Sequence, residues 1–448
     1  MSTSPLVYDK ICLILQIRED FMDLAYLAQL PEAEFVERRH RVLEQMQDNS
    51  AFIIFTETEK RRNNDCDYLF RPDSYFWYLT GFAEPKAALL LIKRAGQIES
   101  VIFVRAKDPL MEIWNGRRLG VECAAEKLHV DQAYDIEELA TILAEKTQNL
   151  TACYYAQGWQ AWGDELVEGV FSDVIDWRPM LAEMRLIKST AEIALIQQAC
   201  HISALAHIRA MKQTRPNRYE MEIEGEIQHE FTRFGSRFPS YNSIVASGDN
   251  ACILHYNENS AVMKDGDLLL IDAGAEFAYY AGDITRTIPV NGKFSEPQKA
   301  LYELVLTAQK EAIQLLVPGN SIKKTNDRVI EVLTEGLVRL GILHGNVETL
   351  IQEKAYRQFY MHGLGHWLGL DVHDVGDYSQ ERSRPLEIGM VITVEPGLYI
   401  SRDADVPEEY KGIGIRIEDN LLITEYGNKN LTSGCPKEIA DIEAIMAS

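Results

Sequence analysis

Leu268-Leu269-Leu270-Ile271-Asp272-Ala273-Gly274 is an apolar run that ends in a carboxylate, and it predicts a buried strand. Tyr280-Ala281-Gly282-Asp283-Ile284-Thr285 follows shortly after and predicts the returning strand of a hairpin. If the hairpin turns about residues 277–278, Asp272 and Asp283 face each other directly across the ladder. Like charges so placed repel, and burying them unpaired costs still more, so a cation between them is one interpretation. The simpler interpretation is one aspartate held by a hydrogen bond and the other in a turn.

Three histidines lie close together farther along the chain. Met361-His362-Gly363-Leu364-Gly365-His366-Trp367-Leu368-Gly369 is followed by Asp371-Val372-His373-Asp374. His362 and His366 have the i, i+4 spacing of a zinc-protease helix, but the glycines disfavour a helix and no glutamate follows His362. We therefore predict a glycine-rich loop or strand that brings imidazoles close to a ligand. One histidine alone is more often structural, whereas three among glycines indicate chemistry.

Two later segments each offer a glutamate. Val391-Ile392-Thr393-Val394-Glu395-Pro396-Gly397 is again an apolar run that ends in an acid, here before a Pro-Gly turn. Between Gly412 and Asn420, isoleucines alternate with a set that contains Arg416 and Glu418, as expected for the two faces of a strand. The polar face of that strand either faces the same site or is simply exposed to solvent.

These segments together offer four carboxylates and one imidazole as metal ligands: Asp272, Asp283, His366, Glu395 and Glu418. Four negative charges balance two divalent cations, and oxygen-rich ligation with one nitrogen suits Mn²⁺ or Co²⁺ well and Zn²⁺ less distinctively. Two ions ~3.5–4 Å apart would share a water and convert it to hydroxide near neutral pH. This is hydrolytic machinery without a protein nucleophile. The sequence contains no Gly-x-Ser-x-Gly elbow, P-loop or dinucleotide fingerprint.

Composition excludes several classes of function. Lys and Arg number 45 against 68 Asp and Glu, a net charge of -23, and no basic run could neutralise nucleic-acid phosphates. The seven cysteines are scattered without a Cys-x-x-Cys pair, so neither a disulfide framework nor a zinc-cysteine site is expected. The apolar run 11–17 is short and is followed by Arg18-Glu19-Asp20, so we expect no membrane span and no signal peptide. The expected location is the cytoplasm.

The length of 448 residues predicts two domains. In the N-terminal part, helices are expected at 33–47 and 136–146 and strands at 51–55, 87–92 and 101–104. Farther on, Ser189-Thr190-Ala191-Glu192 has capping-box spacing and predicts a helix to about Lys212. A helix at 219–234 and two between 296 and 341 follow, with strands among them. We place the domains at 33–185 and 186–448, behind an N-terminal extension 1–32 in which Met22 is an alternative start.

At these residues the sequence resembles the metallopeptidases of the pita-bread fold, and among them aminopeptidase P of the bacterial type. The catalytic stretches that carry the resemblance are Pro239–Val245, Ile253–Tyr256, Ile271–Gly274, Gly282–Thr287, His362–Gly376, Val394–Tyr399 and Ile415–Asp419. In the N-terminal domain the matching stretches are Phe76–Phe82, Glu112–Gly120 and Asp176–Pro179. The resemblance runs from about residue 33 to the end. It implies an α/β N-terminal domain and an α+β pita-bread catalytic domain.

The resemblance also implies roles for individual residues. The metal ligands would be Asp272, Asp283, His366, Glu395 and Glu418, with Asp283 and Glu418 bridging two divalent ions, for which Mn²⁺ is expected. The catalytic residues would be His255, His362, His373, Glu395 and Arg416. The histidines would hold the scissile carbonyl or its oxyanion, Glu395 would carry a proton, and Arg416 would orient ligands. Asp65 would lie near a neighbouring subunit's active site in a homo-oligomer, a tetramer or dimer.

The function implied by the resemblance is hydrolysis of the N-terminal Xaa-Pro bond of a peptide by a hydroxide between the two metals. The nearest alternative is prolidase, which shares the fold and metals but cleaves only Xaa-Pro dipeptides. The motif around Trp114 favours aminopeptidase P. A non-catalytic pita-bread binding protein is disfavoured because all five ligands are present. Methionine aminopeptidase is disfavoured because it lacks an N-terminal domain of this size.

Overall fold

The computed structural model describes residues 30–168 and 170–448, which form two compact units, Leu30–Met184 and Arg185–Ser448. Met22 and most of the expected extension 1–32 lie outside the described residues. Among the helices of the described part, none is long and apolar enough to cross a membrane.

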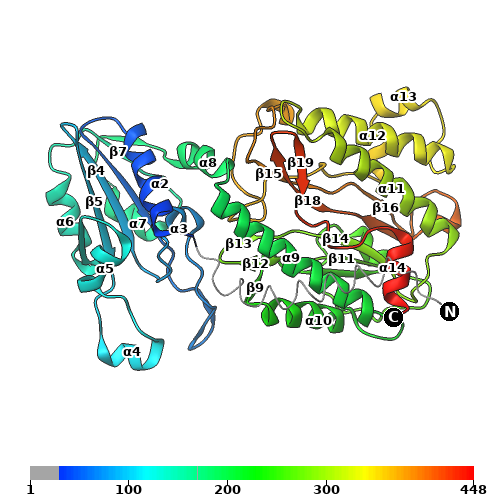
Figure 1. Ribbon diagram of the computed structural model, residues 1–448, viewed down its shortest axis with the longest axis horizontal. Coiled ribbons are helices and arrows are strands. Elements are labelled where there is room, and N and C mark those ends of the chain that lie inside the picture. Colours follow the sequence, from blue (N-terminus) through cyan, green and yellow to red (C-terminus); the bar gives the residue numbers. More distant parts are fainter. Residues whose placement is uncertain (1–29, 169) are drawn as a thin grey trace. The chain divides into compact units, whose positions relative to one another are not determined.

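The N-terminal unit is built on a six-stranded mixed sheet with the order β6-β5-β4-β1-β7-β8. Its strands are β1 (Ser50–Phe55), β4 (Ala88–Arg94), β5 (Gln97–Val104), β6 (Gln132–Asp135), β7 (Ala152–Tyr154) and β8 (Asp173–Ile175). Its helices are α2 (Glu32–Gln45), α3 (Ser74–Thr80), α4 (Pro109–Asn115), α5 (Val121–Leu128), α6 (Leu139–Lys146) and α7 (Ala161–Val167), and α8 (Arg178–Leu186) leads out of the unit. Helices pack on both sides of the sheet (Figure 1). All six residues of β1 are therefore buried.

The predicted elements of this unit are confirmed, with their ends moved by a few residues. The one difference in kind lies at 136–146, where a 3₁₀ turn, Ile136–Glu138, precedes α6. Asp135 accepts a hydrogen bond from the backbone N–H of Glu137 and so caps that turn. Strands β2 (Arg61–Asn63) and β3 (Cys66–Asp67) pair in a separate hairpin, and all their residues are exposed.

The C-terminal unit consists of small antiparallel sheets flanked by long helices. The strands are β9 (Phe238–Pro239), β10 (Ile244–Ser247), β11 (Leu268–Asp272), β12 (Ala275–Phe277), β13 (Tyr280–Ala281), β14 (Thr285–Pro289), β15 (Val391–Val394), β16 (Gly397–Ile400), β17 (Ile413–Arg416), β18 (Asp419–Thr424) and β19 (Gly427–Asn430). The helices are α9 (Thr190–Gln213), α10 (Glu220–Arg233), α11 (Glu296–Leu315), α12 (Ile322–Arg339), α13 (Val347–Gln352) and α14 (Ile439–Met446). Figure 1 shows the strands between the α9–α10 pair and the α11–α12 pair.

The helices predicted in this unit are confirmed, and the capping box begins α9 as expected. Ser189 accepts a hydrogen bond from the N–H of Glu192, whose carboxylate accepts one from the N–H of Ser189. The residues that line the site lie on the strands and on the loops that join them, so the helices form the frame around it.

The hairpin predicted from residue 268 forms, but its register differs from the prediction by two residues. Asp272 pairs with Thr285, not with Asp283. The turn is at Ala278-Tyr279, both with positive φ (48° and 70°), which gives the tight two-residue loop that suits twisted strands. Because side chains alternate with a period of two, this shift leaves Asp272 and Asp283 on the same face as diagonal neighbours.

Candidate active site

A cavity of about 580 Å³ opens in the C-terminal unit, and its wall collects all the site residues that the sequence predicted in that domain. These residues are His255, Asp272, Asp283, His362, His366, His373, Glu395, Arg416 and Glu418. They come from strands and loops as far apart in the sequence as His255 and Glu418, so their meeting is a product of the tertiary fold.

Four carboxylates reach the cavity from strand ends. Asp272 ends β11, Asp283 precedes β14, Glu395 follows β15, and Glu418 lies between β17 and β18. Glu418 is 1% exposed and Arg416 on the same face is 4% exposed. The alternative that this face of the strand is solvent-exposed is therefore wrong, because β17 pairs with β16 and packs inside the unit.

Tyr241 joins the two aspartates. Its hydroxyl lies 2.5 Å from Oδ1 of Asp272 and 2.5 Å from Oδ1 of Asp283. One hydroxyl proton serves two carboxylates, so the pair remains rich in negative charge. Burial, with the two aspartate charges next, raises the pKa of Tyr241 well above its ordinary value. Tyr241 lies in one of the stretches that carry the family resemblance, Pro239–Val245. No role was predicted for it, because a tyrosine is not a typical metal ligand.

Burial is the main cause that raises the pKa values of three of these acids well above their ordinary range: Asp283, Glu395 and Glu418. The charge of a neighbouring carboxylate is the next cause in each case: Asp272 for Asp283, Glu418 for Glu395, and Asp283 for Glu418. A cluster of buried acids that disfavour each other's charge fits divalent cations, whose charge offsets both the burial and the repulsion.

His366 is oriented as a metal-binding histidine. Its Nδ1 lies 3.0 Å from the carbonyl oxygen of Trp367, so this nitrogen carries the proton and donates it. The lone pair of Nε2 then points toward Oδ2 of Asp283 at 3.4 Å and Oε1 of Glu395 at 3.6 Å. One ligand atom each from Asp283, His366 and Glu418 lie within 4.8 Å of one another. A protonated Nδ1 bonded to a carbonyl is the arrangement that fixes a histidine ligand to a metal.

Arg416 and Tyr399 connect the acids to His362. The Tyr399 hydroxyl accepts a hydrogen bond of 2.8 Å from Nη1 of Arg416 and donates one of 2.7 Å to Nε2 of His362. Nδ1 of His362 donates to the carbonyl of Gly363 at 2.8 Å. Burial, with the charge of Arg416 next, lowers the pKa of His362 to about 4. His362 is therefore neutral at physiological pH. The role of Tyr399 was not predicted from the sequence.

His373 and His255 are exposed on the cavity wall. Neither ring has a hydrogen-bond partner among the residues that the structure describes, so their N–H groups are available to a substrate. The rings of His373 and His366 meet edge to face, with centroids 4.2 Å apart. Desolvation in the cavity, followed by the charge of His366, lowers the pKa of His373 to about 4.

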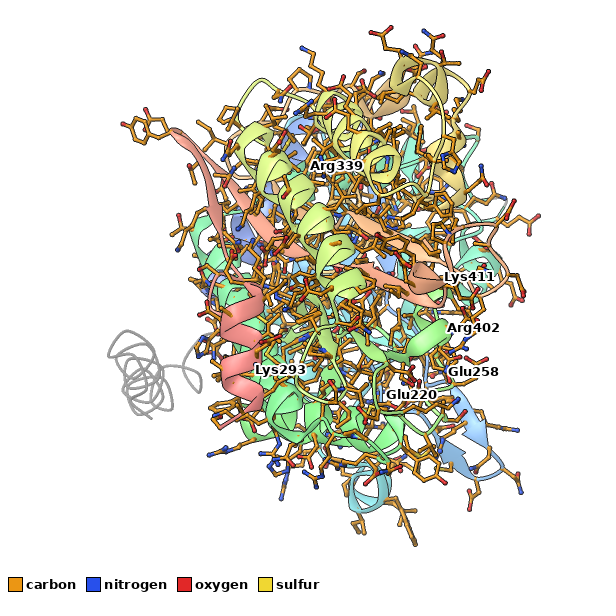
Figure 2. All side chains as sticks on the ribbon, turned by 90° about the vertical axis from the view of Figure 1, so that its right-hand side faces the viewer. Glu220, Glu258, Lys293, Arg339, Arg402 and Lys411 are labelled. Atoms are coloured by element: carbon orange, nitrogen blue, oxygen red, sulfur yellow. The ribbon has the colours of Figure 1, made fainter. Side chains whose placement is uncertain are left out.

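The segment that carries His255 is held by Glu220, the first residue of α10, which Figure 2 labels. The Glu220 carboxylate accepts hydrogen bonds from the Tyr256 hydroxyl at 2.9 Å, the Ala261 N–H at 2.9 Å and the Ser247 N–H at 2.7 Å. These bonds join α10, β10 and the segment after His255. The backbone that presents His255 to the cavity is thus fixed on its far side.

The histidine segment is a loop, as its glycines predicted, and not a helix. A Cβ on Gly365 would lie 2.1 Å from the carbonyl oxygen of Thr393, so only glycine allows this approach. The closeness lets the N–H of His366 donate to Oγ1 of Thr393 at 3.0 Å, while the N–H of Thr393 donates to the His366 carbonyl at 2.9 Å. Gly365 therefore ties the His366 loop to the strand that ends at Glu395.

Asp65 lies in the N-terminal unit. It is exposed and occupies the turn of the β2–β3 hairpin with φ 60°. Its predicted place near a neighbouring subunit's active site stays a prediction.

Comparison with known proteins matches both parts of the chain. Residues 194–425 match the model of metallopeptidase family M24, and residues 35–154 match that of the aminopeptidase P N-terminal domain. The chain is 68% identical over 428 residues to the Xaa-Pro aminopeptidase of Haemophilus influenzae, covering 95% of this chain and 100% of that protein. It is 51% identical over 437 residues to the Xaa-Pro aminopeptidase of Escherichia coli, covering 94% of this chain and 99% of that protein.

Solved structures show the same likeness. A zinc-substituted aminopeptidase P of Escherichia coli in complex with product superimposes with a TM-score of 0.93 at 51% identity, covering 94% of this chain and 99% of that one. Proline aminopeptidase P II from Yersinia pestis superimposes with a TM-score of 0.92 at 51% identity, covering 93% and 100%. The likeness therefore spans both units.

Proposed function

The chain belongs to metallopeptidase family M24, within which it is an aminopeptidase P, and from this premise we propose that it removes the residue that precedes proline at the N-terminus of a peptide. It is a peptidase, and the expected pairing of an α/β N-terminal domain with a pita-bread catalytic domain is confirmed. The observation that carries the proposal is the meeting of four carboxylates and His366 on the wall of one cavity. Three further histidines line the same cavity.

As a metallopeptidase the enzyme uses divalent metal, and the residues proposed to hold it are Asp272, Asp283, His366, Glu395 and Glu418. We propose two ions, with Mn²⁺ as the metal and with Asp283 and Glu418 shared between them. The burial of Asp272, Asp283 and Glu418 supports this assignment. So does the mutual closeness of ligand atoms from Asp283, His366 and Glu418. Two divalent ions so held would polarise the scissile carbonyl and supply a hydroxide between them near neutral pH.

The chain's own residues are proposed to position the substrate and move its proton. Within the described part of the chain, His255 and His373 have ring N–H groups without a partner at the cavity, and these would donate to the carbonyl oxygen as negative charge develops on it. His362, whose Nε2 accepts a hydrogen bond from the Tyr399 hydroxyl, would bind the substrate beside these two histidines. Glu395 would receive the proton of the attacking water and deliver it to the proline nitrogen. That nitrogen is a strongly basic leaving group and needs an acid.

Preference for proline follows from the chemistry of the bond that is cut. The nitrogen of an Xaa-Pro bond carries no N–H. A site that offers no acceptor for such an N–H therefore leaves no donor of this bond without a partner. The proline ring also holds φ near roughly -65°, which gives the substrate a fixed bend. The cavity of about 580 Å³ beside His362 and His373 leaves room for that ring. The free α-amine of the substrate would bind beside the carboxylates of the site, so a free N-terminus is part of what the site recognises.

A peptide panel tests the proposal directly. We expect release of the first residue from Arg-Pro-Pro, and little from Arg-Ala-Pro or from N-acetylated Arg-Pro-Pro. Comparable turnover of Arg-Ala-Pro would remove the proline preference. Faster turnover of the dipeptide Ala-Pro than of Arg-Pro-Pro would move the assignment to prolidase.

The assembly and location of the enzyme belong to the same proposal. We propose a homo-oligomer, a tetramer or dimer, with Asp65 near a neighbouring active site, in the cytoplasm. The exposed position of Asp65 in the turn of the β2–β3 hairpin is compatible with such a contact. Light scattering gives the mass in solution, and Asp65→Ala should lower activity without changing the metal content.

A further inference from the structure

A buried cluster of charged side chains holds the loop that carries His373. Lys188 Nζ lies 2.9 Å from Oδ2 of Asp374, and Arg185 Nη2 lies 2.5 Å from Oδ1 of the same residue and 2.7 Å from Oδ2 of Asp371. Arg185, Lys188 and Asp374 are at most 5% exposed. Neither cation lines the cavity, and the proposed reaction uses neither of them.

The local sequence leaves space for this cluster. A Cβ on Gly369 would lie 2.1 Å from Oδ2 of Asp374 and 3.0 Å from Cε of Lys188, so glycine is needed there. A buried ion pair costs desolvation that its attraction hardly repays, which makes it weak evidence for stability. A buried pair instead selects one conformation, because every alternative leaves a charge unpaired in the interior.

The cluster is connected to the cavity through the backbone of Asp374. The N–H of Asp374 donates to the carbonyl of Trp367 at 2.9 Å, and Nδ1 of His366 donates to the same carbonyl at 3.0 Å. His373 immediately precedes Asp374 and meets the His366 ring edge to face. Fixing the Asp374 carboxylate therefore fixes the residue next to His373 and the carbonyl that orients His366.

We propose that Lys188 and Arg185 are positioning residues that act through Asp374 to hold His373 where it meets the substrate. The proposal rests on the proposed function, in which His373 donates to the carbonyl oxygen. Lys188 contributes no atom to the cavity. It affects the reaction only by setting the position of the His373 ring. Misplacing a catalytic group by about 1 Å costs about 10²-fold in rate.

The test is a double-mutant cycle between Lys188 and His373. Lys188→Met keeps the length of the side chain, removes its charge and leaves Asp374 paired with Arg185. We expect Lys188→Met to lower kcat on Arg-Pro-Pro by about 10- to 100-fold with a smaller change in KM. The same substitution in His373→Ala enzyme is expected to cost no more than about twofold. Metal content and thermal midpoint are measured for every variant, and Lys299→Met, at a partly exposed lysine of α11, is the matched control.

An equal loss from Lys188→Met in both backgrounds, or a loss of bound metal that accounts for it, overturns the proposal. If Lys188→Met does not fold, the double variant Lys188→Met, Asp374→Asn removes both partners and leaves Arg185 paired with Asp371. Its kcat is compared in the wild-type and His373→Ala backgrounds. A loss in the wild-type background alone supports the proposal, and an equal loss in both overturns it. Failure of the proposed function is distinct, because there the wild-type enzyme itself does not cleave Arg-Pro-Pro.

Discussion

Arg416 donates a hydrogen bond of 2.6 Å from Nη2 to Oδ2 of Asp272, although the two residues are 144 positions apart in the sequence. The same guanidinium donates to the Tyr399 hydroxyl from Nη1 at 2.8 Å and to Thr285 Oγ1 from Nε at 3.2 Å. Thr285 in turn donates to Oε2 of Glu418 at 2.7 Å. One planar group thus orients two proposed ligands, one directly and one through a hydroxyl.

Arg416→Lys is therefore expected to weaken the metal site although it keeps the charge. A lysine cannot reproduce the planar fork, so Asp272 and Thr285 lose their fixed geometry. We expect a loss of about 10- to 100-fold in Mn²⁺ affinity or in kcat/KM. Calorimetric titration of metal-free enzyme measures the first and peptide cleavage the second. Arg402→Lys, on the surface in Figure 2, is the control, and wild-type values for Arg416→Lys would refute the role.

Asp283→Asn and Glu418→Gln test the shared ligands. Each removes one negative charge and replaces one of the two carboxylate oxygens at the centre of the acid cluster by an amide NH2, so we expect loss of at least one metal ion and of activity. Elemental analysis of purified protein gives the stoichiometry. Asp327→Asn, on the exposed side of α12, serves as the control. An active variant with the wild-type metal content would contradict the assignment.

The histidines are expected to separate into two groups. His366→Ala should lose metal, because its Nε2 lone pair points at the acids. His373→Ala should keep its metal and lose about 10²–10³ in kcat, the usual cost of an oxyanion donor. Metal content and kcat measured on the same preparations decide between them. A His373→Ala enzyme that binds less metal than wild type would reverse the division.

Stability should fall in acid because of His207, a residue of α9 outside the cavity wall. Burial lowers the pKa of His207 from 6.5 to about 4. Between these pH values the imidazole of His207 is protonated in the unfolded chain but stays neutral in the folded protein. The free energy of unfolding therefore falls as pH decreases from 6.5 to 4. The interval corresponds to about 3 kcal/mol.

His207→Gln tests this, because its amide can donate to the Ala273 carbonyl as Nε2 of His207 does at 3.0 Å. Urea unfolding in the presence of EDTA is measured for both proteins from pH 7.5 to pH 4.5. We expect the advantage of the wild type to shrink over this range by most of the ~3 kcal/mol. A constant difference between the two proteins would show that His207 does not govern the acid response.

The sequence was sufficient for the parts of this protein that depend on neighbouring residues. The capping box at Ser189, the apolar run that ends at Asp272 and the glycines that keep His366 out of a helix are local patterns, and each forms as predicted. Asp272 and Glu395 could also be noticed as candidate ligands, because each is an acid at the end of an apolar run.

The sequence did not predict how those residues meet. The register of the hairpin depended on two positive φ values at Ala278 and Tyr279, which no side-chain type there announces. The role of Tyr241 between two aspartates was not visible either, because that contact joins positions 31 and 42 residues apart.

The chain by itself determined which elements form and which residue types are available for chemistry, since helix caps, strand periodicity and glycine requirements are set by short-range sterics and hydrogen bonds. Only the tertiary structure decided that Arg416 reaches Asp272 and that Lys188 reaches Asp374. Both contacts bury charge, and a buried charge is tolerated only where a distant segment supplies its partner. Such pairs depend on the packing of the whole unit, and local sequence carries no record of them.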